Sequence, residues 1–269
     1  MHATIIHFVQ IRERVALVTG ASEGIGAACV EALRRRGARV ALVARSASKL
    51  EQTARPGDLV IPSDITLEAD RARAVSETLA AFGRIDILIN NAGIGLYAPA
   101  HSAPLDEFRR MFDLNLFAAL GLIQLAVPHM RARRSGSIVN VGSIAGKVTL
   151  PWFTLYSASK YALGSLTDGL RMELAPDNIH CMTVCPGYVK TRFQDHVLGG
   201  RPPEQIRRAK QFAITPEQCA EAILDGIERR ARTVVTPKAG WLFVLAARLF
   251  PATVDARLAA IYHKLEHQL

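Results

Sequence analysis

A tyrosine and a lysine four residues apart are the first side chains in this sequence that indicate chemistry. Tyr156 and Lys160 lie in a stretch with helical periodicity, so they share one face of the predicted helix. A free phenol, with a pKa of about 10, exchanges protons poorly at neutral pH. A neighbouring ammonium favours the phenolate and moves that pKa toward the working range. The pair therefore predicts a general acid or base. The alternative is that both residues are exposed on the helix surface and have no catalytic role.

Two further polar side chains fit the same chemistry. Ser143 follows a predicted strand and carries a hydroxyl that can bind a substrate oxygen. Asn115 stands in the middle of a predicted helix, where asparagine is a poor helix former, so a separate role is indicated. The chain has no cluster of His, Cys and Asp with zinc spacing, and we expect no metal.

A glycine-rich turn joins the first predicted strand, 15–19, to a helix over 24–36. Its spacing, GxxxGxG, places glycines at 20, 24 and 26. Gly20 allows a tight turn, Gly24 lets the backbone approach a pyrophosphate, and Gly26 lets helix and strand pack closely. The phosphates then meet the free N–H groups of the helix N-terminus. Because the motif begins a βαβ unit, it predicts a dinucleotide site rather than a turn without a ligand.

The end of the second predicted strand, 40–43, bears on the choice of dinucleotide. An acidic residue here would hold the adenosine ribose hydroxyls, but this chain has Ala44 and then Arg45. An arginine binds a 2′-phosphate that an acid would repel. We therefore expect NADP(H). NAD(H), with Arg45 merely exposed, is the alternative, and Glu23 in the glycine turn is an unfavourable neighbour for a phosphate.

The elements that must position these residues alternate between apolar, β-branched runs and longer helical patterns. Strands are predicted over 15–19, 40–43, 59–61, 85–89, 137–141, 179–184 and 233–235, and helices over 24–36, 67–82, 106–130, 154–174 and from Thr215 onward. The strand runs show little polar alternation, so both of their faces are buried. This predicts a doubly wound parallel sheet in a three-layer α/β/α fold, with the whole chain, 1–269, as a single domain.

Composition is that of an ordinary globular chain: of 269 residues, 49% are apolar and 21% charged, which excludes a disordered or fibrous protein. The net charge of +9 and a pI near 9.8 raise the possibility of nucleic-acid binding. The basic clusters at 34–36, 131–134 and 229–232 each end a predicted helix, where cations complement the helix dipole. We therefore favour a structural role for them and expect no nucleic acid.

Three features of the sequence indicate the cellular compartment of the protein. The four cysteines form no CxxC pair and stand in apolar stretches, as buried thiols of a reducing compartment do. No segment has the roughly 18–20 uninterrupted apolar residues of a membrane span. Residues 1–10 lack the features of a signal peptide. We expect a cytoplasmic protein.

These motifs, in this order, resemble the short-chain dehydrogenase/reductase (SDR) family, in the branch whose glycine motif is TGxxxGxG. Residues 19–26 match that motif and 90–93 match its NNAG. The family's catalytic set is matched by Asn115, Ser143, Tyr156 and Lys160, and its PG…T segment by Pro186, Gly187 and Thr191. The resemblance covers about 15–191 and, more loosely, the chain to 230. It implies a Rossmann fold and an oxidoreductase acting on CH–OH and C=O groups.

The resemblance also implies roles for single residues. Tyr156 would be the general acid in carbonyl reduction and the base in alcohol oxidation. Lys160 would lower the pKa of Tyr156 and bind the nicotinamide ribose, Ser143 would polarise the carbonyl, and Asn115 would order a water that links Lys160 to solvent. The expected cofactor-binding residues are Gly20, Ser22, Glu23, Gly24, Ile25, Gly26, Arg45, Asp64, Ile65, Asn91, Ala92, Gly93, Tyr156, Lys160, Pro186, Gly187, Val189 and Thr191.

The substrate is less visible in the sequence. By resemblance, the loop 144–155 and a lid at 188–213 border the cleft, and the candidate substrate residues are Ser143, Lys147, Phe153, Tyr156, Tyr188 and Phe193. Their aromatic content suits a lipophilic ketone, 3-oxoacyl or steroid-like substrate; a subunit-contact role for Trp152 and Phe153 is the alternative. A non-catalytic dinucleotide-binding regulator and a nucleic-acid-binding protein are the rival functions.

Both ends of the chain extend beyond the family pattern, at 1–13 and 238–269. The C-terminal extension holds an apolar helix candidate near 241–250 and a second helical pattern through Leu265. We expect it to pack on the core or to form an oligomer contact, with peripheral membrane contact as the next alternative. The family implies a homodimer or homotetramer. The extension puts the tetramer in doubt. A dimer formed through the helices that bear Asn115 and Tyr156 is less affected by it.

Overall fold

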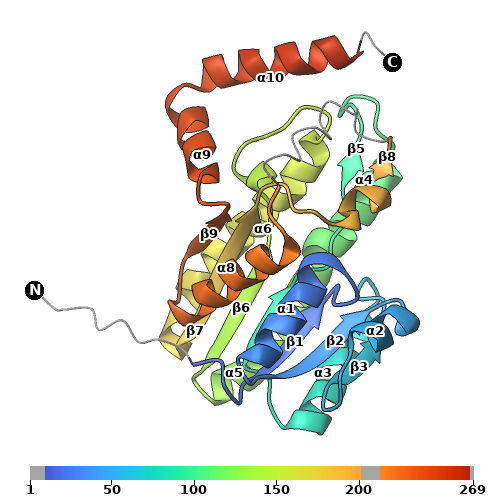
Figure 1. Cartoon of the computed structure of the whole chain (residues 1–269), viewed down its shortest axis with the longest axis vertical. Coiled ribbons are helices and arrows are strands. Elements are labelled where there is room, and N and C mark those ends of the chain that lie inside the picture. The colour runs from blue at the N-terminus through green and yellow to red at the C-terminus, as the bar shows by residue number, and fades with distance from the viewer. Residues whose placement is uncertain (1–9, 201–212, 267–269) are drawn as a thin grey trace, which may run out of the picture.

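The computed structural model describes residues 10–200 and 213–266. Most of the expected N-terminal extension, part of the expected lid (201–212) and the last three residues lie outside the described residues. Within the described part, seven strands form one parallel sheet in the order β3-β2-β1-β4-β6-β7-β9 (Figure 1). The strands are β1 (Val15–Thr19), β2 (Arg39–Ala44), β3 (Leu59–Pro62), β4 (Ile87–Asn90), β6 (Gly136–Val141), β7 (Ile179–Pro186) and β9 (Thr233–Thr236).

Helices cover both faces of this sheet, which confirms the doubly wound single-domain fold. They are α1 (Gly24–Arg35), α2 (Ala47–Thr53), α3 (Glu68–Phe82), α4 (Leu105–Phe112), α5 (Ala118–Ala132), α6 (Thr154–Glu173) and α8 (Pro216–Glu228). Three 3-10 turns, η2 (Ile144–Gly146), η3 (Ala175–Asp177) and η4 (Arg192–His196), lie between them.

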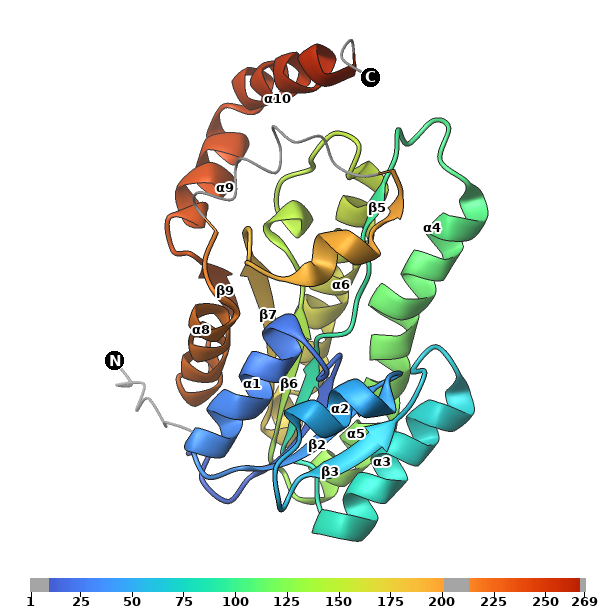
Figure 2. The ribbon, with the colours of Figure 1, turned by 45° about the vertical axis from the view of Figure 1, so that its right-hand side comes forward.

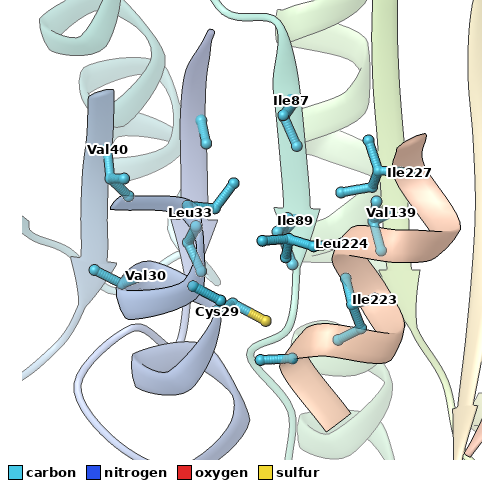
Figure 3. Packing of buried hydrophobic residues seen from close by; sticks show 14 of the residues in the cluster. Cys29, Val30, Leu33, Val40, Ile87, Ile89, Val139, Ile223, Leu224 and Ile227 are labelled. Carbon is cyan, nitrogen blue, oxygen red and sulfur yellow. The ribbon is translucent and has the colours of Figure 1, made fainter. Parts of the chain in front are cut away.

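Each face of the sheet has its own buried cluster. On one side, Cys29 and Leu33 of α1 and Ile223 and Ile227 of α8 pack on the central strands (Figure 3). On the other side, side chains of α3, α5 and α6 pack on the same strands. The strands alternate between the clusters, so that both faces of the sheet are buried and the runs are continuously apolar.

The helix predicted over 106–130 is interrupted. A π-helical turn, η1 (Asp113–Phe117), separates α4 from α5 and contains Asn115. The run Leu105–Ala132 is long and apolar enough to cross a membrane by length and composition. However, Leu122, Ile123 and Met130 are fully buried in the second cluster, and we interpret the run as a core helix.

The structure also contains short elements that we did not predict from the sequence. The helix α2 follows β2, and two strands of two residues each, β5 (Leu96–Tyr97) and β8 (Leu198–Gly199), pair in parallel above the sheet. This small pairing attaches the segment after η4 to the chain that follows β4.

The basic clusters that end α1 and α5 are largely paired with carboxylates. Arg34 binds Asp58, Arg36 binds Asp225, and Arg131 binds Asp177. The four cysteines are free and buried, as expected. These contacts agree with a structural role for the arginines.

The C-terminal extension forms two helices, α9 (Gly240–Leu249), which lies beyond the carboxyl end of β9, and α10 (Pro251–Glu266), which turns back across the top of the molecule (Figures 1 and 2). Val244 of α9 is buried against the body of the protein. Tyr262 of α10 packs with Tyr97, Trp152 and Tyr188. The extension is thus anchored at two points, while much of its surface remains exposed.

Candidate active site

A cleft of about 660 Å³ opens at the carboxyl ends of the central strands. It runs past the ends of β1 and β4, between which the strand order reverses, and doubly wound sheets bind ligands at this point. The volume is within the range of small-molecule and cofactor sites. Most residues expected from the sequence line this cleft, from the glycine turn at one end to Phe193 at the other.

The glycine turn has the geometry that its sequence predicts. Gly20 and Gly24 have φ of +62° and +57°, in the left-handed region that favours glycine. A Cβ on Gly26 would lie 2.1 Å from the carbonyl oxygen of Gly20. The helix α1 then begins after Glu23 without a side-chain cap, so its first N–H groups remain available to an anion.

Polar contacts join the glycine turn to the end of β4. The Thr19 hydroxyl accepts hydrogen bonds from the backbone N–H groups of Asn91 and Ala92, each at 3.0 Å. The Asn91 amide donates in return to the carbonyls of Thr19 and Gly20, at 2.9 and 3.2 Å. The side chains of Thr19 and Asn91 therefore hold the backbone of the glycine turn against the end of β4.

Three of the four expected catalytic side chains meet at the carboxyl end of β6. Tyr156 and Lys160 of α6 are 9% and 5% exposed. The Lys160 ammonium donates to the Val141 carbonyl at 3.0 Å and lies 5.7 Å from the centroid of the Tyr156 ring. Ser143, which caps η2, lies close enough to Tyr156 for its hydroxyl to favour the phenolate and lower the pKa of that tyrosine. A carbonyl oxygen placed here would meet two hydroxyl groups.

Burial dominates the ionisation of this group. It raises the pKa of Tyr156 to about 12, although the Ser143 hydroxyl acts in the opposite direction. It also lowers the pKa of Lys160 to about 8. The sequence led us to expect a tyrosine pKa lowered by Lys160. In this cleft the desolvation of the phenol is larger, and the lysine is held by a backbone carbonyl. Tyr156 is therefore protonated at neutral pH, the state that a proton donor needs.

Asn115 lies behind the cleft and does not line it. Its side-chain oxygen accepts from the Ile94 N–H at 2.9 Å, and its amide donates to the Ile94 carbonyl and to Ser159, at 2.9 and 3.1 Å. Ser159 in turn donates to the carbonyl of Tyr156. The π-helical turn, a feature often found at functional sites, thus lets Asn115 connect the chain after β4 to the catalytic helix.

The end of β2 presents cations to the cleft. Arg45 lines the cleft, is exposed, and makes no hydrogen bond or ion pair within the described part of the chain. Lys49 lies one turn further along α2 and binds Glu23 at 3.2 Å. Asp64 and Ile65, after β3, line the same region. The expected phosphate-binding arginine is therefore free to bind an anion.

A contact across the cleft was not visible in the sequence. Glu23 of the glycine turn accepts a hydrogen bond from His196 of η4 at 2.9 Å. Burial acts to raise the pKa of Glu23, but Lys49 and His196 together hold it below its usual value. These two residues are 173 positions apart, and no local pattern could have paired them.

The opposite end of the cleft is aromatic and apolar. The Tyr156 ring lies 5.9 Å from Phe153 and 5.8 Å from Phe193, centroid to centroid. Tyr188 also lines this end, together with Leu150 and Leu198, which the sequence analysis did not select. Lys147, a candidate substrate residue, is not among the lining residues; its charge acts on Asp168 and Cys185 instead. No group of three or more potential metal ligands occurs among the described residues.

Comparison with known proteins agrees with this architecture. Residues 14–200 match the family described as short chain dehydrogenase. A ketoacyl reductase, HetN, from a Nostoc species is 33% identical over 255 residues, which are 90% of this chain and 87% of that protein.

Two solved structures are similar over most of their length. A 3-ketoacyl-(acyl-carrier-protein) reductase from Brucella melitensis, complexed with NADH, has a TM-score of 0.77 at 28% identity and covers 84% of this chain and 97% of its own. A short chain dehydrogenase from Burkholderia cenocepacia, in complex with NADP, has a TM-score of 0.79 at 31% identity, covering 93% and 99%.

Proposed function

Because this chain belongs to the short-chain dehydrogenase family, we propose that it is an NADP(H)-dependent oxidoreductase acting on a lipophilic ketone or secondary alcohol. The observation that carries the proposal is the meeting of Ser143, Tyr156 and Lys160 beside a cleft that begins at a dinucleotide-type glycine turn. A regulator that only binds a dinucleotide has no need of these three groups.

The residues present fit a nicotinamide dinucleotide. The free N–H groups at the start of α1 suit its pyrophosphate, and any side chain at Gly24 would narrow the gap to Thr191, whose Cγ2 lies 3.1 Å from the Cβ position. Arg45 and Asp64 would hold the adenosine end. Asn91 and Lys160 line the cleft where the nicotinamide end of the dinucleotide would lie. When bound, the nicotinamide ring supplies or accepts a hydride.

The protein's own groups handle the proton. Ser143 and Tyr156 donate hydrogen bonds to the substrate oxygen, and Tyr156 transfers its proton to that oxygen during reduction. In the reverse direction the Tyr156 phenolate accepts a proton from the alcohol. Lys160, while protonated, stabilises the phenolate that forms. Its pKa near 8 means that this charge is lost in mildly alkaline solution.

The preference for NADP(H) is supported by Arg45 and Lys49, two cations at the end of the cleft where the 2′-phosphate would lie. The solved relatives hold NADH in one case and NADP in the other, so this preference rests on these side chains. The aromatic end supports a lipophilic substrate. The names of two relatives, both ketoacyl reductases, add a 3-oxoacyl thioester to the candidates.

We also propose a cytoplasmic homodimer. Four free thiols suit a reducing compartment. The helices that bear Asn115 and Tyr156 expose large apolar side chains, as a subunit contact would require: Phe117 and Met172. A tetramer would need a further interface, and the projecting α9 and α10 alter the surface available for one.

The test is Tyr156→Phe, with ketones and NADPH followed by nicotinamide absorbance. We expect kcat/KM to fall about 10²- to 10⁴-fold, the usual contribution of a general acid, while dinucleotide affinity is unchanged. Tyr161→Phe, on the exposed side of the same helix, is the control and should be fully active. Turnover by Tyr156→Phe at the wild-type rate would remove Tyr156 from the mechanism.

A further inference from the structure

The helix α9 exposes an apolar face that nothing in the described structure covers. Trp241, Leu242, Leu245 and Leu249 are 44%, 71%, 52% and 61% exposed, and we call them the α9 face. We propose that the α9 face docks onto an anionic lipid bilayer and holds the protein at a membrane surface.

Helical geometry makes these four side chains one surface. Positions 241, 245 and 249 follow at intervals of four, and 242 lies beside them on the same side of the helix. Val244, which points to the other side, is 1% exposed and fixes the helix to the body. The apolar face is therefore turned outward by the fold.

The charges around the α9 face suit anionic headgroups. Lys238, Arg248 and Arg257 are exposed on or beside the two C-terminal helices. Asp255 is the single carboxylate among the side chains described between 238 and 263. An outward apolar helix face with tryptophan and leucine, bordered by lysine and arginine, is the pattern of helices that lie in the membrane interface.

A second copy of the chain is a poorer occupant of the same face. A ten-residue helix is about 15 Å long and about 10 Å wide, so its face covers roughly 150 Å². A stable dimer buries about 800 Å² on each partner. A two-fold contact would also bring like cations of the two copies together, in a chain with a net charge of +9. A bilayer requires no such area, and two more exposed apolar side chains stand in this part of the chain, Phe250 between α9 and α10 and Ile261 in α10.

The docking would bring lipid close to the substrate end of the cleft. Tyr262 of α10 packs against Tyr97, and so does Tyr188, which lines that end. A lipophilic substrate dissolved in the bilayer would then be near the cleft, a consequence that rests on the proposed function. The docking itself does not depend on it.

The experiment is sedimentation of the full chain with vesicles of phosphatidylglycerol and phosphatidylcholine, compared with vesicles of phosphatidylcholine alone. The test variant combines Leu242→Ser and Leu245→Ser. The matched control combines Leu67→Ser and Leu105→Ser, two leucines 58% and 65% exposed at the N-terminal ends of α3 and α4. Circular dichroism verifies that each variant is folded.

We expect the wild type and the control to sediment with the anionic vesicles, and the test variant to bind at least about tenfold more weakly. Arg248→Glu should also weaken binding, and added salt should do the same. Turnover of a water-soluble ketone without vesicles should be unchanged in the test variant. Failure of the docking is therefore distinguishable from failure of the proposed dehydrogenase.

Three outcomes would overturn the proposal. The first is no binding of the wild type to anionic vesicles, and the second is an equal loss in the control. The third is a dimer in solution that the Leu242→Ser and Leu245→Ser variant dissociates, without vesicle binding, which would assign the α9 face to a second copy.

Discussion

The two ends of the cleft are built in different ways. The glycine-turn end presents mainly backbone: two glycines with positive φ and the uncapped start of α1, held at the end of β4 by the side chains of Thr19 and Asn91. The aromatic end is made of side chains from separate loops and from α6, and Tyr262 of α10 packs in a cluster beside it. A backbone cradle tolerates few substitutions, whereas a wall of side chains can be reshaped one residue at a time. Binding of the dinucleotide and selection of the substrate thus take place at opposite ends of the cleft.

The largest effect is expected where the two ends meet, at Lys160. Below about pH 8 its ammonium is charged, and above that pH it becomes neutral and no longer stabilises the Tyr156 phenolate. The kcat/KM for reduction should therefore decline on the alkaline side with an apparent pKa near 8. Lys160→Ala should lower kcat/KM by about 10²-fold or more, remove that alkaline decline, and weaken dinucleotide binding.

Lys147→Ala is the control, because Lys147 does not line the cleft. It should keep both the rate and the pH profile. An unchanged pH profile and an unchanged cofactor affinity in Lys160→Ala would show that Lys160 neither stabilises the Tyr156 phenolate nor binds the dinucleotide.

A smaller effect is expected at the glycine-turn end. The Arg45 guanidinium can form charge-assisted hydrogen bonds to a 2′-phosphate, worth about 1.5–3 kcal/mol or about 10- to 150-fold. Because Glu23 is near, we expect the lower half of that range. Arg45→Asp should shift the ratio of kcat/KM for NADPH over NADH by this factor toward NADH. Arg229→Asp makes the same change of net charge away from the cleft and should leave the ratio alone.

If the wild type already prefers NADH, or if Arg45→Asp leaves the ratio unchanged, Arg45 does not determine the choice of cofactor.

The smallest effect is expected at the aromatic end. Tyr262 packs against Tyr97, which also contacts Tyr188, and an aromatic contact contributes about 0.5–1.5 kcal/mol beyond its buried area. Tyr262→Ala should therefore raise KM for a bulky ketone about 2- to 12-fold, with the KM for NADPH unchanged. Steady-state kinetics with a bulky and a small ketone provide the measurement. Equal changes for both ketones, or a change in the NADPH constant, would contradict the separation of the two ends.

What could be predicted from the sequence follows the same division. The glycine turn, the sheet and the residues at strand ends depend on local spacing, and they are found where the spacing indicated. Asn115 was selected as an unusual helix residue, but the π-helical turn around it depends on contacts with Ile94 and Ser159 that only the fold supplies. The direction of the Tyr156 pKa was wrong because burial cannot be read from two residues at i and i+4.

The residues that form the aromatic end of the cleft were the hardest to predict from the sequence. Its residues come from segments without regular periodicity, and Tyr262 reaches it from more than seventy positions beyond Tyr188. Lys147 was selected because it stands in the loop 144–155, which by resemblance borders the cleft, but it is not among the residues that line the cleft. Long-range packing, rather than local propensity, decides which of these side chains meet.

The contact between Glu23 and His196 has a consequence for how molecules enter and leave. Both side chains are partly exposed, at 34% and 51%, and such a pair contributes at most about 1 kcal/mol. That corresponds to a factor of about five between contact made and contact broken. At the glycine-turn end of the cleft, this contact therefore restrains His196 only weakly, whereas Phe193 and the pairing of β5 with β8 hold the rest of the segment in place. A dinucleotide can therefore displace His196 from Glu23 at little cost while the aromatic end of the cleft keeps its shape.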